Sequence, residues 1–128
     1  MTEPVWLQSR LVLALHDMLI AEHGGPSGIR DENLLDSALA RPINLFNYEH
    51  SSLSILAASY AAGIVGNHPF VDGNKRTGFA AAATFLDRNG VELTASEAQA
   101  AQMTIDLAAR DVSEDEYAEW LHKNIQPL

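Results

Sequence analysis

The feature that most constrains the fold is residues 53–66, LSILAASYAAGIVG, because this stretch is apolar on every helical face. One face is occupied by Leu53, Leu56, Tyr60 and Ile64. The other faces carry alanine or other apolar residues at the helical period. A helix that is apolar all round is usually buried in the core. The sequence therefore predicts a central helix with other helices packed around it.

The segments before this stretch show amphipathic helical spacing. Residues 5–22 predict a helix with an inner face of Leu7, Leu11, Ala14, Leu15, Met18 and Leu19. Asp31 is a candidate N-cap for a second helix, whose inner face is expected to contain Leu34, Leu35, Ala38 and Leu39. Pro42 is expected to end that helix, because proline cannot donate a backbone hydrogen bond. Residues 43–52 then predict an irregular loop or a small hairpin.

The segments after the central stretch predict three further helices. Residues 74–88 have an expected inner face of Phe79, Ala82, Ala83 and Leu86, and Gly90 is expected just past the helix end. The extended segment 91–95 predicts one short strand. Two capping-box spacings, Ser96 with Gln99 and Ser113 with Glu116, predict helices over 96–109 and 113–124. The last helix should turn Tyr117, Trp120 and Leu121 inward.

The whole pattern predicts an all-α fold, a compact bundle of about six helices with one short strand or hairpin. The length of 128 residues fits one domain over residues 1–128. The absence of cysteine excludes disulfides and thiolate metal sites. With 17 acids against 8 bases, general nucleic-acid binding is not expected. The chain shows neither a signal peptide nor a membrane-length apolar run, so we expect a cytoplasmic protein without membrane contact.

The stretch HPFVDGNKRTG, residues 68–78, carries the chemistry. Lys75 and Arg76 stand in the first turn of the helix predicted from residue 74, where the positive end of the helix dipole disfavours cations. An anion over the helix start removes this conflict, since free N–H groups and both cations would converge on it. Gly73 would let the backbone approach closely. The stretch therefore predicts a phosphate site.

Other residues of this stretch supply what a phosphate reaction lacks. Asp72 is a hard oxygen ligand suited to Mg²⁺ shared with a nucleotide. His68 is of the residue type that can accept a proton near neutral pH. Phe70 is expected to anchor the loop in the core. Taken singly, these residues have plainer interpretations: Asp72 as a helix N-cap, His68 as a packed or exposed histidine, and the two cations as a solvated face.

The nine residues HPFVDGNKR resemble the signature loop of the Fic/Doc superfamily, most closely its death-on-curing (Doc) toxin branch. The segments GGPSGIRDENLLDSALARP (24–42) and FLDRNG (85–90) resemble the flanks of that loop in Doc-type proteins. The resemblance implies a Fic fold, a general base at His68 and a Mg²⁺ ligand at Asp72. It implies a nucleotide phosphate cradle formed by Gly73, Asn74, Lys75 and Arg76.

One departure from the family pattern bears on the reaction. AMP-transferring Fic enzymes carry glycine at the position of Lys75 and a second arginine at the position of Phe79. The residues here are similar to the Doc branch, which implies transfer of the ATP γ-phosphoryl group, with Mg²⁺, to a protein hydroxyl. The implied target is a threonine of elongation factor Tu, so that translation stops. The alternatives are AMP transfer, a non-catalytic helical binding module, and a metal hydrolase using His16, His23, His50 and His122.

The resemblance also bears on how the target is bound and how the activity is controlled. In relatives a flap before the central helix aligns the target, and residues 41–52 correspond to it. Many Fic proteins carry an inhibitory segment of the form S/T-x-x-x-E-G/N. Glu32–Asn33 matches its end, but Gly28 stands where Ser or Thr is required. The resemblance therefore implies inhibition by a separate antitoxin chain.

Overall fold

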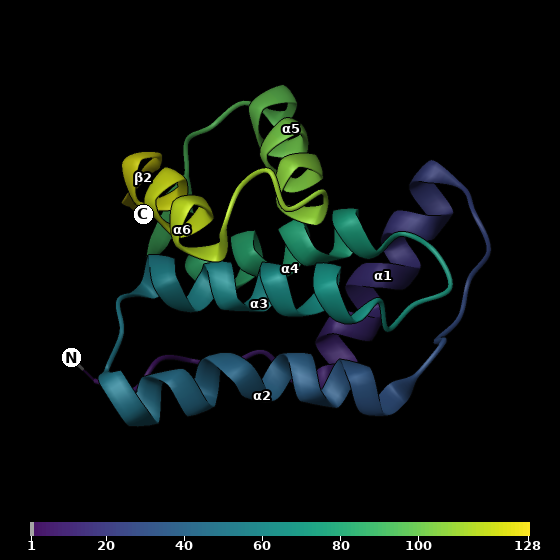
Figure 1. The fold of residues 1–128 in the computed structure, drawn as a ribbon, viewed down its shortest axis with the longest axis horizontal. Helices are drawn as coiled ribbons and strands as arrows, with labels where there is room; N and C mark the ends of the chain where they lie inside the picture. Colours follow the sequence, from purple (N-terminus) through teal and green to yellow (C-terminus); the bar gives the residue numbers. More distant parts are fainter. Residues whose placement is uncertain (1) are drawn as a thin grey trace.

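The computed structural model describes residues 2–128, which form six helices and two short strands (Figure 1). The elements are α1 (Ser9–His23), α2 (Glu32–Glu49), α3 (Leu53–Asn67), α4 (Asn74–Arg88), β1 (Val91–Leu93), α5 (Glu97–Ala108), α6 (Glu114–Lys123) and β2 (Ile125–Pro127). The predicted mainly helical fold class is confirmed. Among these residues no helix is long and apolar enough to cross a membrane.

Helix α3 lies in the middle of the bundle, as its all-round apolar character predicts. In Figure 1 it runs between α2 on one side and α5 and α6 on the other, and it also packs along α4. Ten of its 15 residues are buried, among them Leu56, Tyr60 and Ile64. A helix with no solvent-facing side needs neighbours all around it, and this requirement organises the bundle.

Small residues let two helices approach α3 closely. A Cβ added at Gly63 would lie 3.2 Å from the Cα of Ala38 on α2. A Cβ added at Gly78 on α4 would lie 2.8 Å from Cγ2 of Val65 and 3.2 Å from the carbonyl oxygen of Ala61. Close backbone approach at these points brings the start of α4 against the end of α3, where the HPFVDGNKR loop connects them.

Helix α2 continues through Pro42, so the prediction that Pro42 ends the helix was wrong, as was the loop or hairpin over 43–52. The buried residues of α2 form one stripe with helical spacing: Leu35, Ala38, Leu39, Pro42 and Phe46. An interior proline costs about 3 kcal/mol. Burial of this stripe, which ends in Phe46 packed edge-on against Trp6 at 5.7 Å, offsets that cost. The helix ends at Glu49, and the C-cap residue His50 has a left-handed conformation.

Helix α1 begins at Ser9, later than the predicted residue 5. Residues before it are extended because side chains elsewhere bind their backbone. Asn89 accepts a hydrogen bond from Val5 N–H and donates one to the Val5 carbonyl, and the Tyr60 hydroxyl accepts one from Leu7 N–H. The inner face of α1 also differs from the prediction, since its buried residues are Val12 and His16.

Several expected inward residues are therefore in other environments. Ala14 and Met18 of α1 are exposed. On α4, Ala82 and Leu86 are buried as predicted, but Phe79 and Ala83 are only partly buried. Ala81 and Phe85 are buried instead, and Phe79 lies beside a hollow between α4 and α5. This position of Phe79 bears on the site described below.

The C-terminal half follows its local signals closely. Both capping boxes are present, with reciprocal side-chain and backbone bonds at Ser96–Gln99 and Ser113–Glu116. The predicted strand is confirmed over Val91–Leu93 only. Its partner, β2, was not predicted; the two strands pair antiparallel with Glu92 opposite Gln126.

Candidate active site

The site begins where α3 ends, at His68. This residue has φ 56° and ψ 53°, a left-handed conformation that costs a non-glycine residue about 1–2 kcal/mol. Its backbone N–H still donates to the carbonyl of Ile64 at 3.1 Å. The left-handed residue turns the chain sharply out of the helix, and the imidazole remains exposed.

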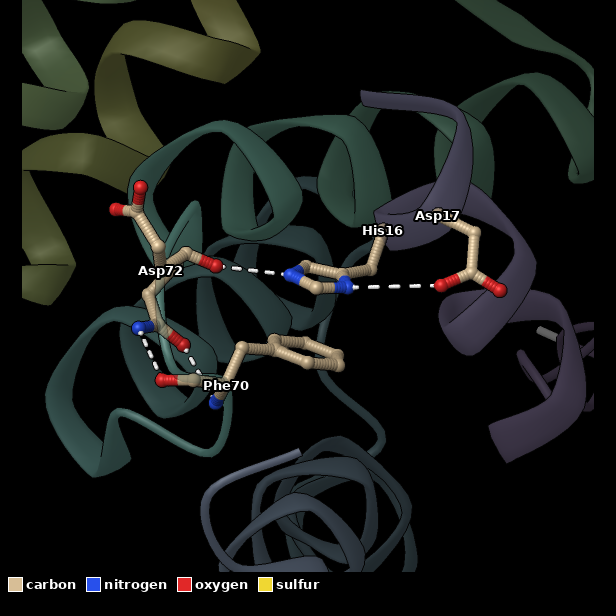
Figure 2. Close-up of polar contacts among 5 residues, drawn as sticks. His16, Asp17, Phe70 and Asp72 are labelled. Atoms are coloured by element: carbon tan, nitrogen blue, oxygen red, sulfur yellow. Dashed lines mark hydrogen bonds and ion pairs between the residues drawn. The ribbon is translucent and has the colours of Figure 1, made fainter. Parts of the chain in front are cut away.

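The loop that follows is anchored to α1 by the stacked rings of Phe70 and His16. Phe70 is completely buried, as predicted, and its ring lies parallel to that of His16 with centroids 3.8 Å apart. His16 is 2 % exposed, and its Nε2 donates to the backbone carbonyl of Asp72 at 2.8 Å (Figure 2). Helix α1 thus holds the middle of the loop at two points.

This role of His16 was not predicted from the sequence, which offered His16 only as one ligand of a possible metal hydrolase. The signal available in the sequence was the spacing of four residues between Val12 and His16, which places both side chains on one face of the helix. The structure shows that this face is buried. A histidine on a buried face needs a polar partner, but periodicity does not reveal which loop supplies it.

The side chain of Asn74 is buried and fully committed to the loop. Its Oδ1 accepts from the backbone N–H of Phe70 at 3.0 Å. Its Nδ2 donates to the carbonyl of Phe70 at 3.0 Å and lies 2.9 Å from Nδ1 of His68. Because the backbone N–H of Phe70 can only donate, the amide orientation is unambiguous, and Nδ1 of His68 must be the acceptor. A neutral His68 in this arrangement carries its proton on Nε2.

The start of α4 has an exposed surplus of positive charge. Gly73 is the N-cap, with φ 79°, and no side chain caps the helix. A Cβ at Gly73 would lie 3.3 Å from Cδ1 of Ile20, so the backbone packs closely on α1. The first helical bond is from Thr77 N–H to the carbonyl of Gly73, which leaves the preceding N–H groups free of helical partners. Lys75 and Arg76 are exposed, and neither forms an ion pair within residues 2–128.

Asp72 is not the N-cap of α4, so that plainer interpretation was wrong. Its Oδ1 accepts from the adjacent Gly73 N–H at 2.8 Å, and its side chain is exposed. On the other side, a Cβ at Gly25 would lie only 2.5 Å from Oδ2 of Asp72, so the turn after α1 abuts the carboxylate. Glycine suits position 25 because φ is 110° there, a backbone conformation that residues with a Cβ rarely adopt.

These residues line one pocket of about 700 Å³ between α1, α4 and α5. Its wall contains all six residues predicted for the site: His68, Asp72, Gly73, Asn74, Lys75 and Arg76. Glu22 and His23 from α1 and Glu97 from α5 also contribute to its lining. A neighbouring hollow of about 380 Å³ lies between α4, β1 and α5 and shares Phe79 with the pocket.

The donor set of the pocket fits a magnesium ion that arrives with a nucleotide. Magnesium is commonly held by one or two carboxylates together with substrate phosphates and water. Asp72 offers one exposed carboxylate in the pocket. Within residues 2–128, no group of three or more His, Asp or Glu side chains is arranged to hold a metal ion alone. The exposed carboxylate of Asp72 in the pocket fits an ion that is shared with nucleotide phosphates.

Comparison with known proteins assigns the chain to a family. Residues 6–86, which include the whole loop, match the model of the Fic/DOC family, and the chain belongs to this family. It is similar to Toxin Doc of Mycolicibacterium smegmatis, with 40% identity over 99 residues, covering 74% of this chain and 76% of that protein. It is also similar to Protein kinase doc of Escherichia phage P1, with 32% identity over 113 residues, 88% of this chain and 89% of that protein.

Proposed function

We propose that this chain is a Doc-type, toxin-like protein kinase. It would transfer the γ-phosphoryl group of ATP to a hydroxyl of a protein target. The observation that carries this proposal is that Asp72, Lys75 and Arg76, at the uncapped start of α4, line the same pocket as His68. Two similar proteins named as a Doc toxin and a Doc protein kinase support the same reading.

The proposed reaction needs alignment and charge neutralisation more than covalent catalysis. The start of α4, with Lys75 and Arg76, would hold the nucleotide phosphates. Asp72 would hold Mg²⁺, which neutralises phosphate charge when bound. The target oxygen forms a bond to the γ-phosphorus while the bond from that phosphorus to the β–γ bridging oxygen breaks, and ADP leaves. His68 would accept the hydroxyl proton.

The contact between Asn74 and His68 adds a requirement to this step. A base acting through Nε2 needs a lone pair there, whereas the hydrogen bond from Asn74 keeps the neutral ring protonated on Nε2. Accepting the target's proton at Nε2 therefore requires the ring proton to move to Nδ1 and the contact from Asn74 to break. The lone pair on Nδ1 is occupied by the same hydrogen bond, so the proposed base can act through either nitrogen only after its contact with Asn74 is released.

Two residues favour phosphoryl transfer over the alternative, AMP transfer. Lys75 replaces the glycine of AMP-transferring Fic enzymes, and Phe79 replaces their second arginine. Phe79 is partly buried and lines the pocket, so an apolar ring is present where that arginine would act on a nucleotide. The second alternative, a non-catalytic helical module, does not explain why two exposed cations stand at the uncapped start of α4.

The target and the regulator follow from the family resemblance. We propose elongation factor Tu as the target, modified on a threonine so that translation stops, and a separate antitoxin chain as the inhibitor. The flap that would align the target corresponds to residues 41–52, which continue α2 to Glu49. We assign no individual target-binding residue in this segment.

The test is transfer of label from ATP to candidate target protein. The chain is incubated with Mg²⁺ and ATP labelled either on the γ-phosphate or on the adenine. Label from the γ-phosphate alone is the expected result, because only the terminal phosphoryl group moves. Adenine label on the target would instead identify an AMP transferase, and the absence of both labels would support the non-catalytic module.

The matched variant for this assay is His68→Ala. We expect it to lose about two to four decades of transfer rate, the usual contribution of a general base. Its ATP affinity, measured by calorimetry, should stay close to that of the wild-type chain, since Lys75 and Arg76 are unchanged. A variant that transfers label at the wild-type rate would exclude His68 as the base.

A further inference from the structure

We propose that Arg30 is a positioning residue for His68. Its guanidinium donates hydrogen bonds to the end of α3 from a different segment of the chain and thereby sets the direction of the imidazole. This inference rests on the function proposed above, in which His68 acts on the target hydroxyl. It adds a residue that lies outside the HPFVDGNKR loop and outside the pocket lining.

The conformation of His68 needs support from outside. Its left-handed backbone is unfavourable for a residue with a Cβ, so the surrounding contacts must maintain it. The last carbonyls of a helix also lack partners within the helix, and they carry the negative end of its dipole. The last turn of α3 contains no basic residue that could satisfy these carbonyls.

Arg30 provides that support directly. Its Nε donates to the carbonyl of His68 at 2.7 Å, and its Nη2 donates to the carbonyl of Asn67 at 3.0 Å. One planar guanidinium thus spans two consecutive carbonyls, which holds both peptide planes that meet at the Cα of His68 as well as the position of the helix end. Together these two planes define φ and ψ of His68 and therefore the direction in which its side chain projects.

Arg30 is itself held against the loop by its backbone. Arg30 N–H and Asp31 N–H both donate to the carbonyl of Pro69, at 2.7 and 3.0 Å. Val71 N–H donates to the carbonyl of Gly28 at 3.1 Å, and Ile29 pairs with Phe70 in an isolated antiparallel bridge. The guanidinium is exposed, but it projects from a short segment whose backbone is hydrogen-bonded to the loop.

A second arginine that binds α3 provides a comparison for the effect on the imidazole. Arg41 donates to the carbonyl of Ser59 on α3 at 3.1 Å and pairs with Glu114 of α6 at 2.7 Å. It also joins separate elements through an exposed guanidinium, but its α3 contact lies nine residues before His68. Losing Arg41 should therefore weaken the fold without changing the imidazole, whereas losing Arg30 should change the imidazole itself.

The experiment compares Arg30→Gln and Arg30→Lys with Arg41→Gln. The imidazole signals of His68 are recorded by NMR in the ¹⁵N-labelled full chain and assigned with His68→Ala. Thermal unfolding is measured for all variants, and kcat and KM for ATP are measured for the two Arg30 variants in the label-transfer assay.

For Arg30→Gln we expect displaced His68 signals and a 10- to 100-fold lower kcat, the order of loss caused by misplacing a reacting group. KM for ATP should change by less than about threefold, because the phosphate-binding residues are untouched.

Arg30→Lys should recover only part of the lost kcat, since an ammonium keeps the charge but cannot span both carbonyls. Arg41→Gln should leave the His68 signals unchanged. The proposal is overturned if the His68 signals of Arg30→Gln match those of the wild-type chain, or if Arg30→Lys restores the full rate. A wild-type chain without any transfer activity would contradict the proposed function instead, and the imidazole signals would still test Arg30.

Discussion

Thr77 follows the two exposed cations of α4 and has the opposite environment. It is completely buried, and its hydroxyl has no hydrogen-bond partner among the residues described. A buried hydroxyl without a partner loses its hydration and gains nothing in return. Asn74, three residues earlier, has every polar atom of its side chain bonded. Neighbouring polar residues at the start of α4 thus differ sharply in what they contribute to stability.

We predict that Thr77→Val raises the free energy of unfolding by about 1 kcal/mol, because valine keeps the shape and removes the unpaired hydroxyl. Urea unfolding followed by circular dichroism measures the change. Thr77→Ser is the control, since it keeps the hydroxyl and loses the buried methyl group, and it should be less stable than the wild-type chain. A destabilised valine variant would show that the hydroxyl is in fact bonded.

At the scale of elements, the two glycines of α3, Gly63 and Gly66, differ in how closely a neighbouring helix approaches them. Gly63 faces α2, where the backbone of Ala38 is the nearest obstacle to a Cβ. Gly66 lies on the same helix but has no atom within 4 Å of the place where a Cβ would be. Gly63 lies inside α3 and Gly66 in its last turn, and at helical positions alanine is intrinsically favoured over glycine. Packing alone distinguishes them.

We therefore predict opposite signs for the same substitution at these two positions. Gly63→Ala should lower the free energy of unfolding by about 1–3 kcal/mol, because the backbone of α2 must move away. Gly66→Ala should raise it by up to about 1 kcal/mol through helix propensity. Chemical denaturation of both variants under identical conditions provides the comparison. Equal effects at the two sites would contradict the close approach of α2 to α3.

At the scale of the whole molecule, the bundle buries two tyrosines deeply enough to change their titration. Burial raises the pKa of Tyr117 to about 12, although a hydrogen bond with Thr104 lowers it somewhat. Burial also raises the pKa of Tyr60 above its usual value. In the unfolded chain both hydroxyls titrate near pH 10. The folded state therefore keeps protons that the unfolded state loses at alkaline pH.

This difference predicts alkaline destabilisation. The contribution of Tyr117 to stability is complete below pH 10 and is lost progressively as the pH rises from 10 to about 12, where the unfolded chain binds fewer protons. The total loss from Tyr117 is on the order of 2–3 kcal/mol. Urea unfolding at pH 8, 10 and 11 measures it. Tyr117→Phe should show a shallower decline, and an identical decline would assign the effect to other groups.

Part of the candidate site was predictable because its signals lie close together in the sequence. The residues from His68 to Arg76 span nine positions, so a turn and a helix start suffice to bring them to one pocket. The supports of that loop were not predictable in this way. His16 and Arg30 reach it from segments 56 and 38 residues away, measured at the hydrogen bonds they form.

The same division applies to the fold. The sequence by itself determined the six helices, the central position of α3 and the capped starts of α5 and α6, because periodicity and caps act within one or two turns. Only the tertiary structure decided that α2 continues through Pro42, that residues before Ser9 stay extended and that β2 joins β1. In each of these cases, packing or hydrogen bonding with a distant part of the chain outweighs the local preference of the backbone.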